Sequence, residues 1–109
     1  MQQDKILSML GLAKRAKKIC SGAPLCEKEI KQRRSELIII AKDTSDNSKK
    51  AITDSCRYYS VKYFEYATMA DLGKAVGAAG DRVVVSVNDK GFAKALLDKY
   101  AEFENRKEW

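Results

Sequence analysis

The chain contains 109 residues, of which 45% are hydrophobic and 33% are charged, and its net charge at pH 7 is +6. This length supports one domain, residues 1–109, with a single core, and the composition excludes a wholly disordered chain. No apolar run approaches the roughly 18 residues that span a membrane, and the start lacks a signal-peptide pattern, so we expect a cytoplasmic protein without membrane contact.

The first predicted element is a helix over residues 3–16. Its apolar residues recur at spacings of three and four and form one stripe, made of Ile6, Met9, Leu10 and Ala13. Basic residues crowd its C-terminal end, where they also favour the helix dipole. Residues 19–20 form at most a short strand, and Ser21 and Gly22 then open a second helix that has Pro24 in its first turn.

The clearest strand signal is the apolar run over residues 37–41, which is typical of a strand buried on both faces of an α/β sheet. The remaining elements follow as helix 48–59, strand 61–66, helix 68–76 with Thr68 as its cap, and strand 82–87. Asn88 or Asp89 caps a last helix, whose inner face carries an apolar stripe made of Phe92, Leu96 and Tyr100, with Phe103 as a further candidate. Helices and strands alternate, which predicts a three-layer α/β/α sandwich with a small mixed four-stranded sheet. Residues 105–109 are expected to fray.

The positive charge is confined to the first half of the chain. Residues 1–50 contain twelve Lys and Arg against six Asp and Glu, whereas residues 51–109 contain nine of each. Within residues 5–34 the count is nine basic to two acidic. Such one-sided charge suits a polyanion-binding surface, because neutralised phosphates release condensed counterions. A face that only keeps the protein in solution is the alternative, and charge alone does not decide between the two.

The templates of enzymatic sites are missing. The sequence has no phosphate-binding P-loop, no dinucleotide-binding glycine fingerprint and no nucleophile elbow. It contains no histidine, which excludes a serine triad, a Cys–His pair and a Cys/His zinc site. Asp43 resembles a phosphoacceptor at a strand end, but the acidic Mg²⁺ cluster that such chemistry needs is absent from the sequence. We expect no catalytic activity, no cofactor and no metal site.

Three cysteines are present, Cys20, Cys26 and Cys56, without a Cys-x-x-Cys pair. An odd number argues against a disulfide framework, so we expect reduced thiols that act as small buried hydrophobes. Cys26 lies close to the start of a helix, where the dipole lowers a thiol pKa, and an activated thiol is the alternative there.

Three loops are the candidate binding elements, and they can gather at one edge of the sandwich. Residues 21–23 lie at the start of the second helix, where free N–H groups and the helix dipole favour an anion. Lys28 and Lys31 follow one and two turns later and can reach neighbouring phosphates. Taken alone, this segment is explained more simply as a helix cap.

The second candidate loop follows the buried strand, and the third precedes the last strand. Residues 42–45 follow the buried strand, which is the usual place for ligands in open α/β sheets. Residues 76–80 are small and apolar between basic residues, and they can pack on an unstacked base. Taken alone, residues 42–45 also fit an ordinary connection between a strand and a helix, and residues 76–80 also fit a glycine hinge. The residues singled out here are Lys42, Asp43, Val76, Gly77 and Ala78.

Several ordered segments together carry a family resemblance: Gly22 with Lys28, and residues 11–16, 37–43, 53–59, 72–77 and 91–93. This set resembles the kink-turn RNA-binding ribosomal proteins, the L-seven-Ae family, and most closely its small bacterial YlxQ-like branch. The resemblance covers about residues 5–100. It implies a three-layer domain that grips RNA with the three loops, and the positions that match the family are Gly22, Lys28, Lys42, Val76 and Gly77.

Together with the loops, the resemblance implies a monomeric, ribosome-associated protein whose partners are structured RNA, such as ribosomal RNA, and other ribosomal proteins. The expected RNA-binding residues are Gly22, Ala23, Lys28, Lys31, Lys42, Asp43, Val76, Gly77 and Ala78.

One segment departs from the family pattern Gly-x-Asn-Glu-x-x-Lys. Pro24 stands in place of the Asn and Leu25 in place of the Glu, and neither side chain can hydrogen-bond a base edge. Because phosphate contacts position a protein without specifying sequence, we expect RNA binding with weakened or altered kink-turn selectivity. The alternative is a protein–protein module, in which Leu25, Val76 and residues 77–80 form an exposed apolar patch for a partner.

Overall fold

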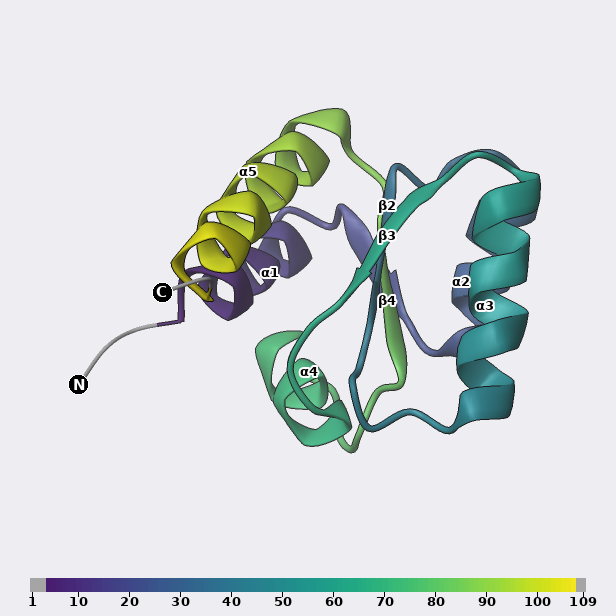
Figure 1. Cartoon of the computed structure of the whole chain (residues 1–109), viewed down its shortest axis with the longest axis horizontal. Helices are drawn as coiled ribbons and strands as arrows, with labels where there is room; N and C mark the ends of the chain where they lie inside the picture. Colours follow the sequence, from purple (N-terminus) through teal and green to yellow (C-terminus); the bar gives the residue numbers. More distant parts are fainter. Residues whose placement is uncertain (1–3, 108–109) are drawn as a thin grey trace.

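A computed structural model describes residues 4–107 of the chain, with side chains as far as residue 105. Helices and strands alternate along the described chain (Figure 1). The elements are α1 (Lys5–Arg15), β1 (Ile19–Ser21), α2 (Ala23–Lys31), β2 (Leu37–Ile40), α3 (Asp46–Tyr58), β3 (Lys62–Glu65), α4 (Met69–Ala75), β4 (Val84–Val87) and α5 (Lys90–Lys107). None of the described helices has the length and apolar character needed to cross a membrane.

The four strands form one mixed sheet in the order β1-β4-β2-β3. Strand β2 runs parallel to β3 and antiparallel to β4, which in turn runs antiparallel to β1. Every residue of β2 is fully buried. The predicted mixed four-stranded sheet is therefore confirmed, and the apolar run 37–41 provides its interior strand as expected.

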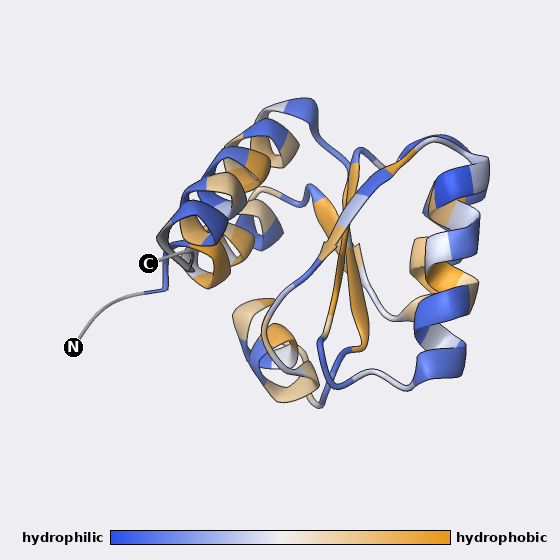
Figure 2. Cartoon of the chain, in the orientation of Figure 1, coloured by the Kyte–Doolittle hydropathy of each residue, from blue (hydrophilic) through white to orange (hydrophobic). Residues whose placement is uncertain are grey.

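Two helical layers cover the sheet. Helices α2 and α3 lie on one face, and α1, α4 and α5 lie on the other (Figure 1). Along β2, Ile38 packs toward α2 and α3 while Leu37 and Ile39 pack toward the opposite layer. This alternation explains why the strand is apolar at every position, and Figure 2 shows an apolar sheet interior between helices α3 and α5, which carry polar residues on their outer sides.

Side-chain caps define where the helices begin. Asp4, Ser45, Thr68 and Asp89 each accept a hydrogen bond from a first-turn N–H of α1, α3, α4 and α5, respectively. Thr68 was predicted as a cap from the sequence, and the structure confirms it. The predicted start of the third helix, Ser48, differs from the structure. The structure starts it two residues earlier, because Ser45 accepts from the N–H of Ser48 at 3.3 Å.

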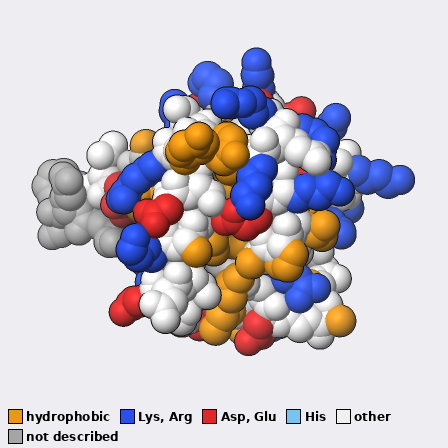
Figure 3. All heavy atoms as spheres, turned by 90° about the vertical axis from the view of Figure 1, so that its right-hand side faces the viewer, with side chains coloured by type: hydrophobic (Ala, Val, Ile, Leu, Met, Phe, Trp, Pro, Cys, Tyr) orange, Lys and Arg blue, Asp and Glu red, His pale blue; other side chains and the backbone are white. Residues whose placement is uncertain are grey.

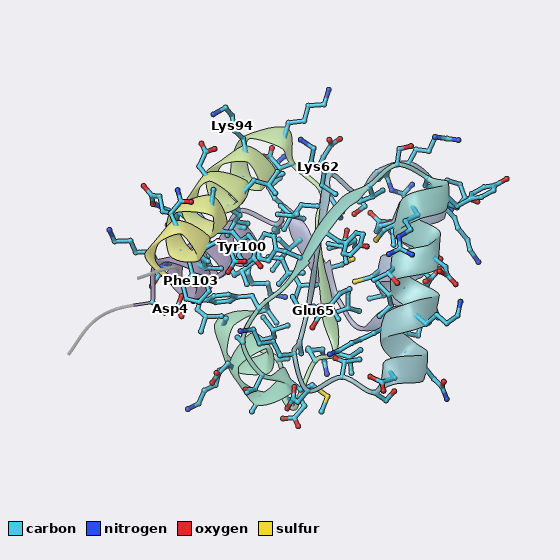
Figure 4. The ribbon with its side chains drawn as sticks, in the orientation of Figure 1. Asp4, Lys62, Glu65, Lys94, Tyr100 and Phe103 are labelled. Carbon is cyan, nitrogen blue, oxygen red and sulfur yellow. The ribbon has the colours of Figure 1, made fainter. Side chains whose placement is uncertain are left out.

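The C-terminal helix is longer than predicted. The helix α5 extends through Lys107, past the start of the segment 105–109 that was expected to fray, and residues 108–109 lie outside the described chain. Aromatic packing holds this half of the helix: the Tyr100 ring stacks on Phe64 with centroids 4.0 Å apart, and Phe103 meets Tyr66 edge-on at 5.3 Å (Figure 4).

Burial decides the chemistry of the cysteines. Cys26 and Cys56 are in the core between the sheet and the α2–α3 layer, and all three cysteines are free thiols. A side-chain hydrogen bond with Cys20, together with burial, raises the pKa of the Cys26 thiol well above its ordinary value. The alternative of an activated Cys26 is therefore wrong. Burial also raises the pKa of the Cys56 thiol to about 12.

These thiols predict a loss of stability at alkaline pH. Below an ordinary thiol pKa of about 9, Cys56 is protonated in both states, and its contribution to stability is complete. Between pH 9 and the folded value of about 12, only the unfolded thiol ionises, so the free energy of unfolding falls by about 1.4 kcal/mol per pH unit for this thiol. Urea denaturation at pH 7.5 and 10.5 measures the fall. The free energy of unfolding of Cys56→Ala should fall less than that of wild type between these two pH values. An equal fall in both proteins would contradict the raised pKa of Cys56.

Candidate nucleic-acid interface

Three connections meet at one end of the sheet, and we call this end the loop edge: Gly22, residues 41–45 and residues 76–83. The N–H of Gly22 donates to the carbonyl of Val84 at 2.9 Å. On the neighbouring strand, the N–H of Ala41 donates to the carbonyl of Val83, also at 2.9 Å. The carboxyl ends of β1 and β2 therefore lie beside the amino end of β4, at the bottom of Figure 1.

The start of α2 offers open backbone at this edge. Gly22 has φ 93° and ψ 146°, a conformation that favours glycine. A Cβ placed on it would meet no atom of the described chain within 4 Å, so a ligand can approach the backbone closely. Pro24 occupies the first turn, and no described side chain caps the helix. The free N–H groups and the helix dipole therefore favour an anion here.

The α4–β4 connection is fixed from both sides. Gly73 packs so closely on Gly80 that an added Cβ would lie 2.2 Å from the Gly80 carbonyl oxygen. At the other side, Arg82 donates from Nε to the Ser21 hydroxyl at 3.1 Å and from Nη1 to the Asp81 carbonyl at 2.9 Å. Arg82 thus joins the first and third loops and adds a partly exposed guanidinium to the edge. The sequence placed Arg82 beside the loop, but its contact with Ser21 depends on strand pairing across 61 residues.

Val76 requires a correction. The sequence predicted it as an exposed apolar residue of the third loop, but only 2% of its surface is exposed and it belongs to the core. The reason is its position four residues after Leu72, which places both side chains on the inner face of α4. Gly77, with φ 66°, is exposed, and Ala78 is half-buried against the core. The third loop can therefore meet a ligand through Gly77 and its backbone but not through Val76.

The second loop also differs from the expectation. Asp43 accepts the N–H of Met69 at 2.8 Å, so its carboxylate ties this loop to the start of α4. The ammonium of Lys42 lies 6.0 Å from the centroid of the Phe103 ring, on the side of the sheet that α5 covers. There it borders a cleft that is also lined by Asp4 and Asp71. The structure thus separates the charge of Lys42 from Gly22.

The two lysines of α2 lie at different distances from the loop edge. Lys28 is exposed on the second turn, about 7.5 Å along the helix axis from Ala23 at 1.5 Å per residue. Lys31 is the last residue of the helix, about 12 Å along its axis from Ala23 at 1.5 Å per residue. The structure therefore places the Cα of Lys28 nearer than that of Lys31 to Gly22 and Ala23.

Comparisons with known proteins agree with this fold. Residues 4–97 match the ribosomal protein L7Ae/L30e/S12e/Gadd45 family. The chain is 45% identical over 89 residues to the RNA-binding protein YlxQ of Bacillus subtilis strain 168, a match that covers 82% of this chain and 88% of the relative. It is 34% identical over 92 residues to the protein of the same name from Enterococcus faecium, with 84% and 87% covered.

Solved structures give the same picture. A protein of unknown function from Bacillus halodurans superposes with a TM-score of 0.84 and 32% identity, over 89% of this chain and 97% of that one. The 15.5kD RNA-binding protein of Giardia lamblia superposes with a TM-score of 0.76 over 96% and 92%. Its identity to this chain is 19%, so this second likeness shows the fold alone.

Proposed function

The chain belongs to the ribosomal protein L7Ae/L30e/S12e/Gadd45 family and to its YlxQ-like branch, and we propose that it is a non-enzymatic RNA-binding protein. Its ligand is structured, kink-turn-like RNA, held at the loop edge, and its place of action is the ribosome or another cytoplasmic ribonucleoprotein. The observation that carries the proposal is the open backbone at Gly22 and Gly77, two loop-edge glycines, together with the start of α2, which no described side chain caps. Phosphate groups fit such a surface, because it offers N–H donors and a positive dipole without side chains in the way.

The first turn of α2 accounts for the proposed selectivity. Pro24 lacks a backbone N–H, and the exposed Leu25 side chain presents only carbon atoms to a ligand. Where other family members have base-reading Asn and Glu, this chain has an apolar surface beside its phosphate-binding backbone. Each missing base contact costs about 1–3 kcal/mol of discrimination. The protein therefore holds the RNA backbone firmly, but it distinguishes a kink-turn from other RNA structures less well than family members that carry the Asn and the Glu.

The salt dependence of binding to a kink-turn RNA tests the placement of this interface. Lys28→Ala should reduce the slope of log affinity against log salt by about one unit, because one phosphate contact is lost. Lys31→Ala is the matched control: it removes the same charge from the same helix, about 12 Å from the helix start. Equal effects of the two substitutions would show that the loop edge is not the phosphate-binding site.

A further inference from the structure

The far end of the sheet carries four connections, residues 16–18, 32–36, 59–61 and 88–89, whereas the β3–α4 connection, residues 66–68, lies beside residues 41–45 at the loop edge. Two hydrogen bonds of 2.8 Å hold this end together, from the N–H of Asn88 to the carbonyl of Lys18 and from the N–H of Glu36 to the carbonyl of Val87. The four residues of β2 span about 13 Å, so the far end and the loop edge are separate surfaces.

Charge is divided unequally between the two ends. The far-end segments contain eleven Lys and Arg against three acidic residues, in 14–18, 29–36, 57–62 and 88–94. The loop-edge segments contain six basic and six acidic residues, in 21–28, 40–50 and 65–83. Figure 3 faces α2 and α3 and shows most of the Lys and Arg side chains in its upper half, toward the far end. The basic excess of the sequence therefore lies mainly away from the three loops.

An aromatic residue stands within this basic surface. Tyr58, the last residue of α3, is 80% exposed. Its ring rests edge-on against Tyr59, with centroids 4.8 Å apart, and the guanidinium of Arg33 lies 5.4 Å from the Tyr59 centroid. The helix dipole explains a cation such as Arg57 at a helix end, but it does not explain an uncovered ring. Tyr58 packs on no core cluster of the described chain.

We propose that the far end is a second RNA-binding surface, on which Tyr58 stacks an unpaired base while Arg33 and Arg57 hold the flanking phosphates. This inference rests on the proposed function and adds a separate contact to it. An exposed ring on a basic surface suits single-stranded nucleic acid, because every base has a face to stack and every nucleotide a phosphate. The chain thereby engages structured RNA at the loop edge and an adjoining single strand at the far end.

Binding of a fluorescein-labelled 12-nucleotide single-stranded RNA, measured by anisotropy at two salt concentrations, tests this inference. Tyr58→Ala should lower the affinity at least about fivefold, whereas Tyr58→Phe should retain it, because stacking needs the ring and not the hydroxyl. Arg33→Gln with Arg57→Gln should lower both the affinity and the salt slope. All these side chains are exposed, and thermal melting checks that the variants remain folded.

Two further probes separate the possible outcomes. Heparin is a polyanion without bases. It should bind the Arg33→Gln/Arg57→Gln variant more weakly than wild type, and it should bind Tyr58→Ala as tightly as wild type. An equal affinity of Tyr58→Ala and wild type for the single strand, or no binding of the strand by wild type, would overturn the inference. Titration with a blunt kink-turn RNA tests the proposed function independently. Its affinity should fall with Lys28→Ala and should not change with Tyr58→Ala.

Discussion

Replacing Gly73 with alanine is expected to destabilise the protein by about 3 kcal/mol. The added Cβ would lie 2.2 Å from the carbonyl oxygen of Gly80, 3.1 Å from its carbonyl carbon and 3.3 Å from the Cα of Asp81. All three atoms belong to the backbone, so no side-chain rotation can relieve the clash. The α4–β4 connection has to move, and Gly77 moves with it, so the variant should also bind RNA more weakly at temperatures where it is still folded.

Gly11→Ala is the matched control for this prediction. It also adds one methyl group to a helix that packs on α4, but its Cβ would lie 3.5 Å from the carbonyl oxygen of Ala75, which is ordinary contact. The higher helix propensity of alanine should make this variant as stable as wild type or up to about 1 kcal/mol more stable. Urea denaturation of the two variants measures the difference. If Gly73→Ala proved as stable as Gly11→Ala, the close packing of Gly73 on Gly80 would be contradicted.

Restoring the family pattern in α2 is expected to increase kink-turn selectivity about tenfold or more. In the double variant Pro24→Asn/Leu25→Glu, an amide and a carboxylate would stand on the exposed first turn of α2, where both can reach base edges. The helix dipole stabilises the new carboxylate, which repels the phosphates of an RNA that offers it no hydrogen-bond donor. The affinity for a plain duplex should therefore fall. Paired anisotropy titrations against a kink-turn RNA and a duplex of equal length measure the ratio.

The control for the double variant is Pro24→Ala/Leu25→Ala, which removes the same two side chains without adding hydrogen-bonding groups. It should leave the ratio of the two affinities unchanged. Should Pro24→Asn/Leu25→Glu also leave the ratio unchanged, α2 would not face the bases, and the proposed orientation of the RNA would be wrong.

Much of the fold follows from the sequence, because its elements have strong local signals. The apolar run 37–41, the capping residue Thr68 and the stripe on α5 led to the correct element types and to the mixed sheet. The end of α5 did not follow, since its order depends on Phe103 packing against Tyr66, a contact across 37 residues. Boundaries of this kind are set by tertiary packing, which propensity and periodicity do not report.

The candidate site was harder to predict. The sequence correctly placed the three loops at one edge, because the carboxyl ends of β1 and β2 necessarily adjoin the start of an antiparallel β4. It did not predict that Val76 turns inward or that Lys42 lies beside Phe103, because spacing does not fix the direction of a side chain in a loop. Nor did it predict that the basic excess gathers at the far end, which depends on how four connections assemble.

The most direct test of the central claim is a titration of the wild-type protein against a kink-turn RNA and a plain duplex of equal length, at low and physiological salt. If the loop edge recognises the kinked backbone, the kink-turn RNA should bind more tightly than the duplex, and the preference should persist at physiological salt. Equal, strongly salt-dependent affinities would show that RNA is held by charge alone, and absence of binding to either RNA would contradict the proposed function itself.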